Sequence, residues 1–156
     1  MNGKGKLGKA GEDEVCRYLI SRGHTILERN WRAGKLEIDI ISLSSGGIHF
    51  VEVKSRTAPV QGEPEEAVNA VKQRNIVKAA RRYISTRGCE LSDSLEIWFD
   101  VAAVTFDGGD IRINYFPGAF VPIYAWGICL AQRCRASRIS TYPFSRAPRT
   151  GPSCDF

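Results

Sequence analysis

Two short apolar runs separated by a glycine-containing turn constrain the fold more than any other feature of this chain. Leu36–Leu43 and Ile48–Lys54 are rich in β-branched and aromatic residues, and Ser44-Ser45-Gly46-Gly47 lies between them. This pattern predicts a β-hairpin. Because both runs are largely apolar, with charges at only a few positions, we expect their strands to lie inside a covered sheet.

The segments around the hairpin predict an α/β chain. An apolar stripe predicts a helix over residues 7–22, and residues 25–32 resemble a strand. After the hairpin we expect a long helix over residues 65–87 and two strands over residues 96–104 and 111–116. The order of these segments predicts a mixed sheet with a helix on each side. The expected apolar face of the second helix comprises Val68, Val71, Ile76, Ala79 and Tyr83.

Charged residues occupy alternate positions within the apolar hairpin. Residues two apart in a strand share a face, so Glu52 and Lys54 project together. A two-residue turn at Gly46-Gly47 would pair Asp39 with Lys54, whereas a four-residue loop over residues 44–47 would pair Asp39 with Glu52. Either register places Asp39 on the same face as Glu52 and Lys54, within about 5–8 Å.

Carboxylates embedded in apolar strands favour a metal site. Buried charges are costly unless they are paired or bound to a metal, although a Glu-x-Lys pair alone is common on protein surfaces. Mg²⁺ prefers oxygen ligands, retains water, and lowers the pKa of that water. Lys54 would orient the water or neutralise developing negative charge. Glu12 is a third carboxylate, and Gly8 and Gly11 would let its helix approach another backbone closely.

Several sequence blocks in series carry a resemblance to a known family. The match covers roughly residues 5–120. Together the blocks closely resemble the YraN-like family of uncharacterised bacterial proteins. That family looks like a branch of the restriction-endonuclease-like superfamily, whose PD-(D/E)xK motif is shared with archaeal Holliday junction resolvases. The blocks are Gly8-Lys9-Ala10-Gly11-Glu12, Glu28-Arg29-Asn30-Trp31-Arg32, Glu37-Ile38-Asp39-Ile40-Ile41, Phe50-Val51-Glu52-Val53-Lys54-Ser55-Arg56 and Phe99-Asp100-Val101.

The resemblance implies a restriction-endonuclease-like α/β/α sandwich with a central mixed sheet flanked by helices. It implies metal-ligand roles for Asp39 and Glu52, the catalytic lysine role for Lys54, and an accessory acidic role at the metal for Glu12. Many superfamily members have proline before the aspartate. Ile38 stands there in this chain, which removes no ligand.

Four further side chains are candidates for contact with nucleic-acid phosphates. They are Arg32, Arg56, Lys72 and Gln73. Lys72 falls within the apolar face of the second expected helix, which is unusual for a solvated lysine; the alternative is that its ammonium extends past the sheet edge. Base-specific recognition is not expected, since the sequence shows neither a helix-turn-helix nor a long basic stripe in its core.

Other polar residues in apolar surroundings have a structural interpretation. Asp100 lies on an interior strand, and we expect it to form a structural pair rather than to bind a metal. His24 lies at a helix end and His49 alternates away from Glu52, so neither is chosen as a general base.

The net charge of +5 lies mainly in the C-terminal region. Residues 1–120 hold 17 Lys+Arg against 16 Asp+Glu, whereas residues 121–156 hold five arginines and one aspartate. Charge therefore supports a polyanionic partner only weakly. We divide the chain into a nuclease-like domain, residues 1–120, and an Arg/Pro-rich extension, residues 121–156, which we expect to be poorly ordered.

The remaining composition excludes several classes of protein. The longest apolar run is well short of the roughly 20 residues that span a bilayer, and no signal peptide is evident, so we expect a cytoplasmic protein. Five scattered cysteines without a CxxC pair argue against a zinc site and a disulfide framework.

The leading prediction is a nuclease that uses Mg²⁺ or Mn²⁺ to activate water for attack on a DNA phosphodiester. Branched or single-stranded intermediates of repair and recombination are the expected substrates. Resolvase-type chemistry would need a homodimer to make two cuts. One alternative is a nucleic-acid-binding module that keeps the fold without turnover. Another is an interaction protein whose acidic cluster merely pairs with Lys54 and with arginines.

Overall fold

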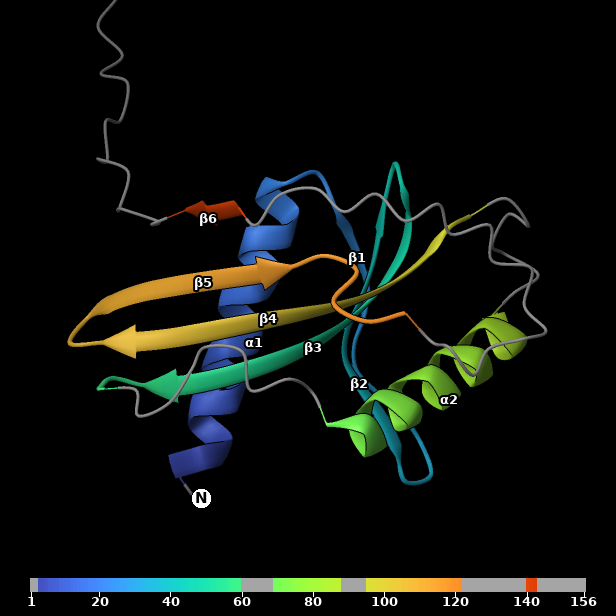
Figure 1. Cartoon of the computed structure of the whole chain (residues 1–156), viewed down its shortest axis with the longest axis horizontal. Helices are drawn as coiled ribbons and strands as arrows, with labels where there is room; N and C mark the ends of the chain where they lie inside the picture. Colours follow the sequence, from blue (N-terminus) through green and yellow to red (C-terminus); the bar gives the residue numbers. More distant parts are fainter. Residues whose placement is uncertain (1–2, 60–68, 88–94, 122–139, 143–156) are drawn as a thin grey trace, which may run out of the picture.

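Two helices and six strands make up the described part of the chain (Figure 1). The computed structural model describes residues 3–59, 69–87, 95–121 and 140–142. In chain order the elements are α1 (Gly3–Ser21), β1 (Thr25–Ala33), β2 (Leu36–Ser44), β3 (Gly47–Thr57), α2 (Ala70–Arg87), β4 (Ile97–Asp107), β5 (Asp110–Phe116) and β6 (Ser140–Tyr142).

The strands form one mixed sheet in the order β1-β2-β3-β4-β5-β6. Strands β3 and β4 pair in parallel, and the other neighbours pair antiparallel. Parallel neighbours require a long crossover connection, and α2 provides it between β3 and β4. The predicted mixed sheet is therefore confirmed.

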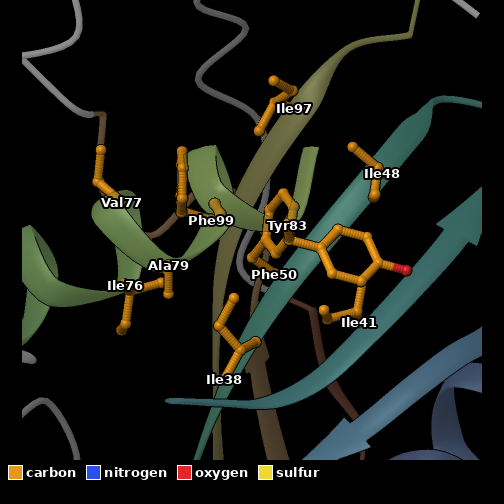
Figure 2. Close-up of a cluster of buried hydrophobic side chains, with 11 residues drawn as sticks. Ile38, Ile41, Ile48, Phe50, Ile76, Val77, Ala79, Tyr83, Ile97 and Phe99 are labelled. Atoms are coloured by element: carbon orange, nitrogen blue, oxygen red, sulfur yellow. The ribbon is translucent and has the colours of Figure 1, made fainter. Parts of the chain in front are cut away.

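Within the described ranges, one helix lies on each face of the sheet. On one face, α1 contributes Val15, Cys16 and Leu19 to a buried cluster with strand residues such as Val51 and Val104. On the other face, α2 covers Phe50, whose ring meets the ring of Tyr83 edge-on with centroids 6.0 Å apart (Figure 2). The chain thus has the expected α/β/α layers.

The β2–β3 hairpin has the register predicted for the four-residue loop. Leu43 pairs with Ile48, and Ser44 pairs with Gly47, so the turn itself is Ser45-Gly46. Gly47 has a φ of +138°, and a Cβ atom there would lie 2.1 Å from the carbonyl oxygen of Glu96. Glycine is required at this position because a side chain would clash with the residue just before β4.

The helix limits differ from those expected. Helix α1 begins at Gly3 rather than at residue 7, so its helical backbone extends beyond the apolar stripe from which the limit was predicted. Helix α2 begins at Ala70 rather than at residue 65: Asn69 lies outside the helix and its side-chain oxygen accepts the N–H of Lys72 at 2.9 Å. Residues 65–68 lie outside the described part of the chain.

Placing Val71 on the buried face of α2 was wrong. Its side chain is 57% exposed, and the buried stripe of the helix begins at Ile76. The first turn of α2 carries Lys72 toward the sheet instead, which positions a charge beside the candidate site described below.

The C-terminal region contributes one short strand to the described structure. The backbone of β6 pairs with β5 from Tyr115–Ser140 to Ile113–Tyr142. The expected poor order of the extension otherwise concerns residues 122–139 and 143–156, which lie outside the described residues. No helix in the described ranges is both long and apolar enough to span a membrane.

Candidate active site

The β2–β3 ladder ends where the candidate site begins. Backbone pairing runs from Ser44–Gly47 to Ile40–Val51. One residue farther along β2, Asp39 Oδ2 accepts a hydrogen bond of 2.8 Å from the backbone N–H of Val53. In a regular antiparallel ladder a main-chain carbonyl accepts such an N–H. The Asp39 carboxylate therefore takes the place of a backbone acceptor and is fixed at the gap between the two strands.

Glu52 is a buried carboxylate held between two lysines. The residue is only 3% exposed and lies on the α2 face of β3, as Phe50 does. Its Oε1 lies 3.0 Å from Lys54 Nζ, and its Oε2 lies 3.1 Å from Lys72 Nζ. Apart from that ammonium, Oε2 has no hydrogen-bond partner in the described structure. The two positive charges beside Glu52 thus come from different elements, β3 and α2.

Lys72 belongs to the same cluster rather than extending past the sheet edge. Its Nζ also lies 3.6 Å from Glu37 Oε1, and its side chain is 26% exposed. Burial disfavours the charged form of Lys72, but the nearby carboxylates of Glu52, Asp39 and Glu37 outweigh it and raise the lysine pKa. Lys72 therefore remains an ammonium ion within the cluster.

The pKa of Asp39 is raised to about 7. Burial is the largest cause, and the negative charge of Glu52 is the next, whereas the hydrogen bond from Val53 and the charge of Lys72 act in the opposite direction. Near neutral pH the Asp39–Glu52 pair therefore carries less than its full negative charge. A divalent cation would favour the fully ionised pair.

This shift predicts that Asp39→Asn stabilises the metal-free protein above pH 7. The pKa of Asp39 is about 7 in the folded chain and 3.8 for an unperturbed aspartate. Between these pH values the folded chain holds a proton that the unfolded chain has released. The stability that this proton contributes is lost as pH rises through 7. Asparagine keeps an acceptor for Val53 and removes the charge. In urea unfolding with EDTA, we expect a gain of about 1–3 kcal/mol at pH 8 and almost none at pH 4. A gain independent of pH would contradict this explanation.

Glu12 lies close to the pair but has partners of its own. Its Oε2 accepts a hydrogen bond of 2.7 Å from Asn30 Nδ2 and lies 3.9 Å from Arg29 Nη2. The charge of Glu12 contributes to raising the pKa of Asp39. Across the described residues, no three His, Cys, Asp or Glu side chains are arranged to hold one metal ion. The structure thus presents Asp39 and Glu52 as a pair, with Glu12 turned toward β1.

Of the two N-terminal glycines expected to approach another backbone, one makes a close approach, and it is to a side chain. A Cβ atom on Gly11 would lie 1.9 Å from Ser55 Oγ on β3, so only glycine lets α1 pack there without displacing that side chain. At Gly8 nothing lies within 4 Å of the corresponding position, so the same expectation was wrong for Gly8. Gly11 sets the height of the adjacent Glu12 above the sheet.

The other candidate phosphate contacts differ in their exposure. Arg32 is exposed, and its Nη2 lies 3.4 Å from Glu37 Oε2. Glu37 therefore connects Arg32 to Lys72 at the rim of the site. Arg56 on β3 and Gln73 on α2 are each half-buried.

Two asparagines near the site were not identified from the sequence. Asn30 donates to Glu12, and Asn69 accepts the N–H of Lys72. Only Asn69, which directly precedes a helix, had a recognisable signal, since asparagine is favoured at that position. The contact of Asn30 depends on how β1 packs beside α1.

Asp100 forms a separate buried network, as expected of a structural residue. It is fully buried, and its Oδ2 lies 2.6 Å from His49 Nδ1 and accepts the hydroxyl of Tyr115. Its Oδ1 accepts the backbone N–H of Gly118 at 2.8 Å. Burial, followed by the charge of Asp100, raises the pKa of Tyr115. This network joins β3, β4 and β5.

The family of the chain follows from comparison with known proteins. The family model described as uncharacterised protein family UPF0102 matches residues 11–104, a range that contains Glu12, Asp39, Glu52 and Lys54. The chain belongs to this family. The expected YraN-like membership is therefore confirmed.

Relatives of this UPF0102 chain occur in several bacteria. A UPF0102 protein of Anaeromyxobacter dehalogenans is 41% identical over 76% of this chain and 87% of its own length. Another, from Syntrophotalea carbinolica, is 43% identical over 73% of this chain and 90% of its own length. A third, from Bacteroides thetaiotaomicron, is 36% identical over 75% and 93%, respectively. These names state no activity, so function is argued from the site.

Proposed function

We propose that this UPF0102 chain is a metal-dependent nuclease that hydrolyses phosphodiester bonds in DNA. The observation that carries the proposal is the Asp39–Glu52 pair. One carboxylate is fixed at a gap in the sheet, the other is almost fully buried beside it, and two lysines lie within 3.1 Å of the second. Such pairing of close carboxylates with lysines, together with a perturbed pKa, is typical of catalytic sites.

The residues present fit Mg²⁺ or Mn²⁺. Asp39 and Glu52 supply carboxylate oxygens, which these hard cations prefer, and Oε2 of Glu52 is buried with an ammonium as its sole partner in the described structure. Asp39 and Glu52 would hold the cation, and Glu12 is the accessory ligand that the resemblance implies. When bound, the cation acts as a Lewis acid and lowers the pKa of a bound water.

The remaining side chains would bind and orient the substrate. Lys54 places a positive charge beside Glu52, where it stabilises negative charge on the phosphate during attack by water. Arg32, Lys72, Arg56 and Gln73 would contact phosphates next to the scissile bond. Branched or single-stranded DNA is the proposed substrate class, with a homodimer for paired cuts.

A second candidate function is nucleic-acid binding without turnover. It is favoured by the arrangement of Glu52, whose charge Lys54 and Lys72 already neutralise, and by Glu12, which is turned toward Asn30. A chain locked in this arrangement would bind phosphates through its basic side chains but would not assemble three metal ligands.

Metal-dependent cleavage distinguishes the two functions. With branched, single-stranded and duplex DNA, we expect cleavage by the wild-type chain in Mg²⁺ or Mn²⁺ and none in EDTA. In Asp39→Ala, cleavage is lost and calorimetry shows at least about tenfold weaker Mn²⁺ binding, because half of the carboxylate pair is missing. Asp107→Ala, which removes an exposed acid at the end of β4, is the matched control.

Each other outcome has a defined meaning. Cleavage that persists in Asp39→Ala would show that the site is assigned to the wrong residues. Binding of DNA without cleavage in several divalent metals would establish the binding module. Failure of the wild-type chain to bind Mg²⁺ or Mn²⁺ would favour the remaining alternative, an interaction protein in which the carboxylates serve as partners of Lys54 and Lys72.

A further inference from the structure

A lysine ammonium lies against Glu52, one of the carboxylates that the proposed function assigns to a metal. Lys72 Nζ lies 3.1 Å from Glu52 Oε2 and 3.6 Å from Glu37 Oε1. Its backbone is fixed, because the Lys72 N–H donates to the Asn69 side chain at the start of α2. The lysine stem therefore reaches from an anchored helix end to Glu52.

We propose that Lys72 is a built-in counter-ion that holds Glu52 in the metal-free protein, is displaced when a divalent cation binds, and then contacts a substrate phosphate. This inference rests on the proposed function, since it concerns regulation of the same site. It adds that the divalent cation replaces the Lys72 ammonium at Glu52. Metal binding itself would then create part of the surface that binds nucleic acid.

Competition follows from the contacts of Glu52. Its Oε1 is occupied by Lys54 and its Oε2 by Lys72, so a metal ion that takes either oxygen meets a positive charge about 3 Å from that oxygen. Charges of like sign held so close together repel strongly in a partly buried site. One of the two ammonium groups must therefore move.

Lys72 is the ammonium that bridges two carboxylates. Its Nζ lies 3.1 Å from Glu52 Oε2 and 3.6 Å from Glu37 Oε1, whereas Lys54 forms its ion pair with Glu52. Lys72 also has an alternative partner. Glu37 is exposed at the rim, and a short movement of the flexible lysine stem toward it releases Glu52 Oε2.

The displaced ammonium would meet nucleic acid at that rim. Arg32 Nη2 already lies 3.4 Å from the other oxygen of Glu37, so Lys72 would join an arginine at the same place. Two cations around one exposed carboxylate leave excess positive charge for a phosphate. Metal binding should therefore strengthen DNA binding, and by linkage DNA should strengthen metal binding.

Substitution of Lys72 tests the competition through metal binding rather than cleavage. Lys72→Met keeps an apolar stem and removes the charge, so we expect Mn²⁺ affinity, measured by calorimetry, to rise about tenfold. Lys72→Arg retains a cation and should bind Mn²⁺ within about twofold of wild type. Lys78→Met removes an exposed lysine from the same helix and controls for net charge; its Mn²⁺ affinity should not change.

A measurement on the unaltered chain covers the case in which Lys72→Met fails to fold. Mild acetylation followed by peptide mapping should modify Lys72 several-fold faster in Mg²⁺ than in EDTA, because its amine leaves Glu52, whereas Lys78 should react equally in both. Unchanged Mn²⁺ affinity in Lys72→Met, or unchanged acetylation of Lys72, would overturn the exchange and leave the nuclease proposal intact. Absence of Mn²⁺ binding by the wild-type chain would instead overturn the proposed function, and the exchange with it.

Discussion

Replacement of Lys54 by methionine is expected to lower the rate of DNA cleavage by about 10²–10³-fold while divalent-cation binding persists. The Lys54 ammonium lies 3.0 Å from Glu52 Oε1, at the edge of the proposed metal site. Its charge would act on the phosphate as negative charge develops there, so its loss should affect the transition state more than the bound ground state. Methionine keeps most of the length of the stem.

Single-turnover cleavage at saturating Mg²⁺, together with Mn²⁺ calorimetry, separates these effects. We expect a large fall in the cleavage rate with metal affinity equal to or above that of the wild type, since a competing charge has been removed. Lys35→Met, in the exposed turn between β1 and β2, is the matched control. A variant that cleaves at the wild-type rate would exclude Lys54 as the catalytic lysine, and parallel loss of metal binding and cleavage would show that its role is structural.

The second large effect concerns stability rather than catalysis. Asp100→Ala is expected to lower the free energy of unfolding by about 3–5 kcal/mol. The carboxylate is fully buried, and its removal leaves His49, the Tyr115 hydroxyl and the Gly118 N–H without their shared acceptor. Buried polar groups that lose a partner are destabilising by the full free energy of their desolvation.

Urea unfolding at pH 7.5 measures this loss. Asp100→Asn keeps an oxygen of similar size but not its charge, and it should retain part of the stability. Asp110→Ala, an exposed acid at the start of β5, should change stability by no more than about 0.5 kcal/mol. A loss below about 1 kcal/mol in Asp100→Ala would show that water readily replaces the carboxylate, and that the network does not stabilise the three strands.

Periodicity in the sequence predicted the layers of this fold well. Side chains of the hairpin strands point to alternate faces, and both registers considered for its turn keep Asp39 on the same face as Glu52 and Lys54; the structure selects the register in which Leu43 pairs with Ile48. Periodicity failed at the first turn of α2. The apolar face predicted for this helix from its spacing includes Val71. Which turns of a helix the sheet covers depends on tertiary packing, and Val71 is exposed.

In the candidate site, only contacts that depend on spacing within one element could be predicted from the sequence. The spacing of Glu52 and Lys54 within one strand predicts their contact, which the structure shows at 3.0 Å. The partners of Glu12 and Glu52 on other elements could not be predicted in this way. Asn30 meets Glu12 from β1, and Lys72 meets Glu52 from α2, because separate elements pack at particular angles. No spacing in the sequence encodes those angles.

The carboxylate that replaces a backbone acceptor at the end of the β2–β3 ladder also makes the site observable without a substrate. The amide proton of Val53 is bonded to Asp39 Oδ2, which belongs to the carboxylate that the proposed metal would also engage. Its chemical shift and its rate of exchange with solvent therefore report directly on the ionisation and occupancy of Asp39. One backbone resonance thus serves as a built-in spectroscopic probe, by which ligands can be ranked before any reaction is known.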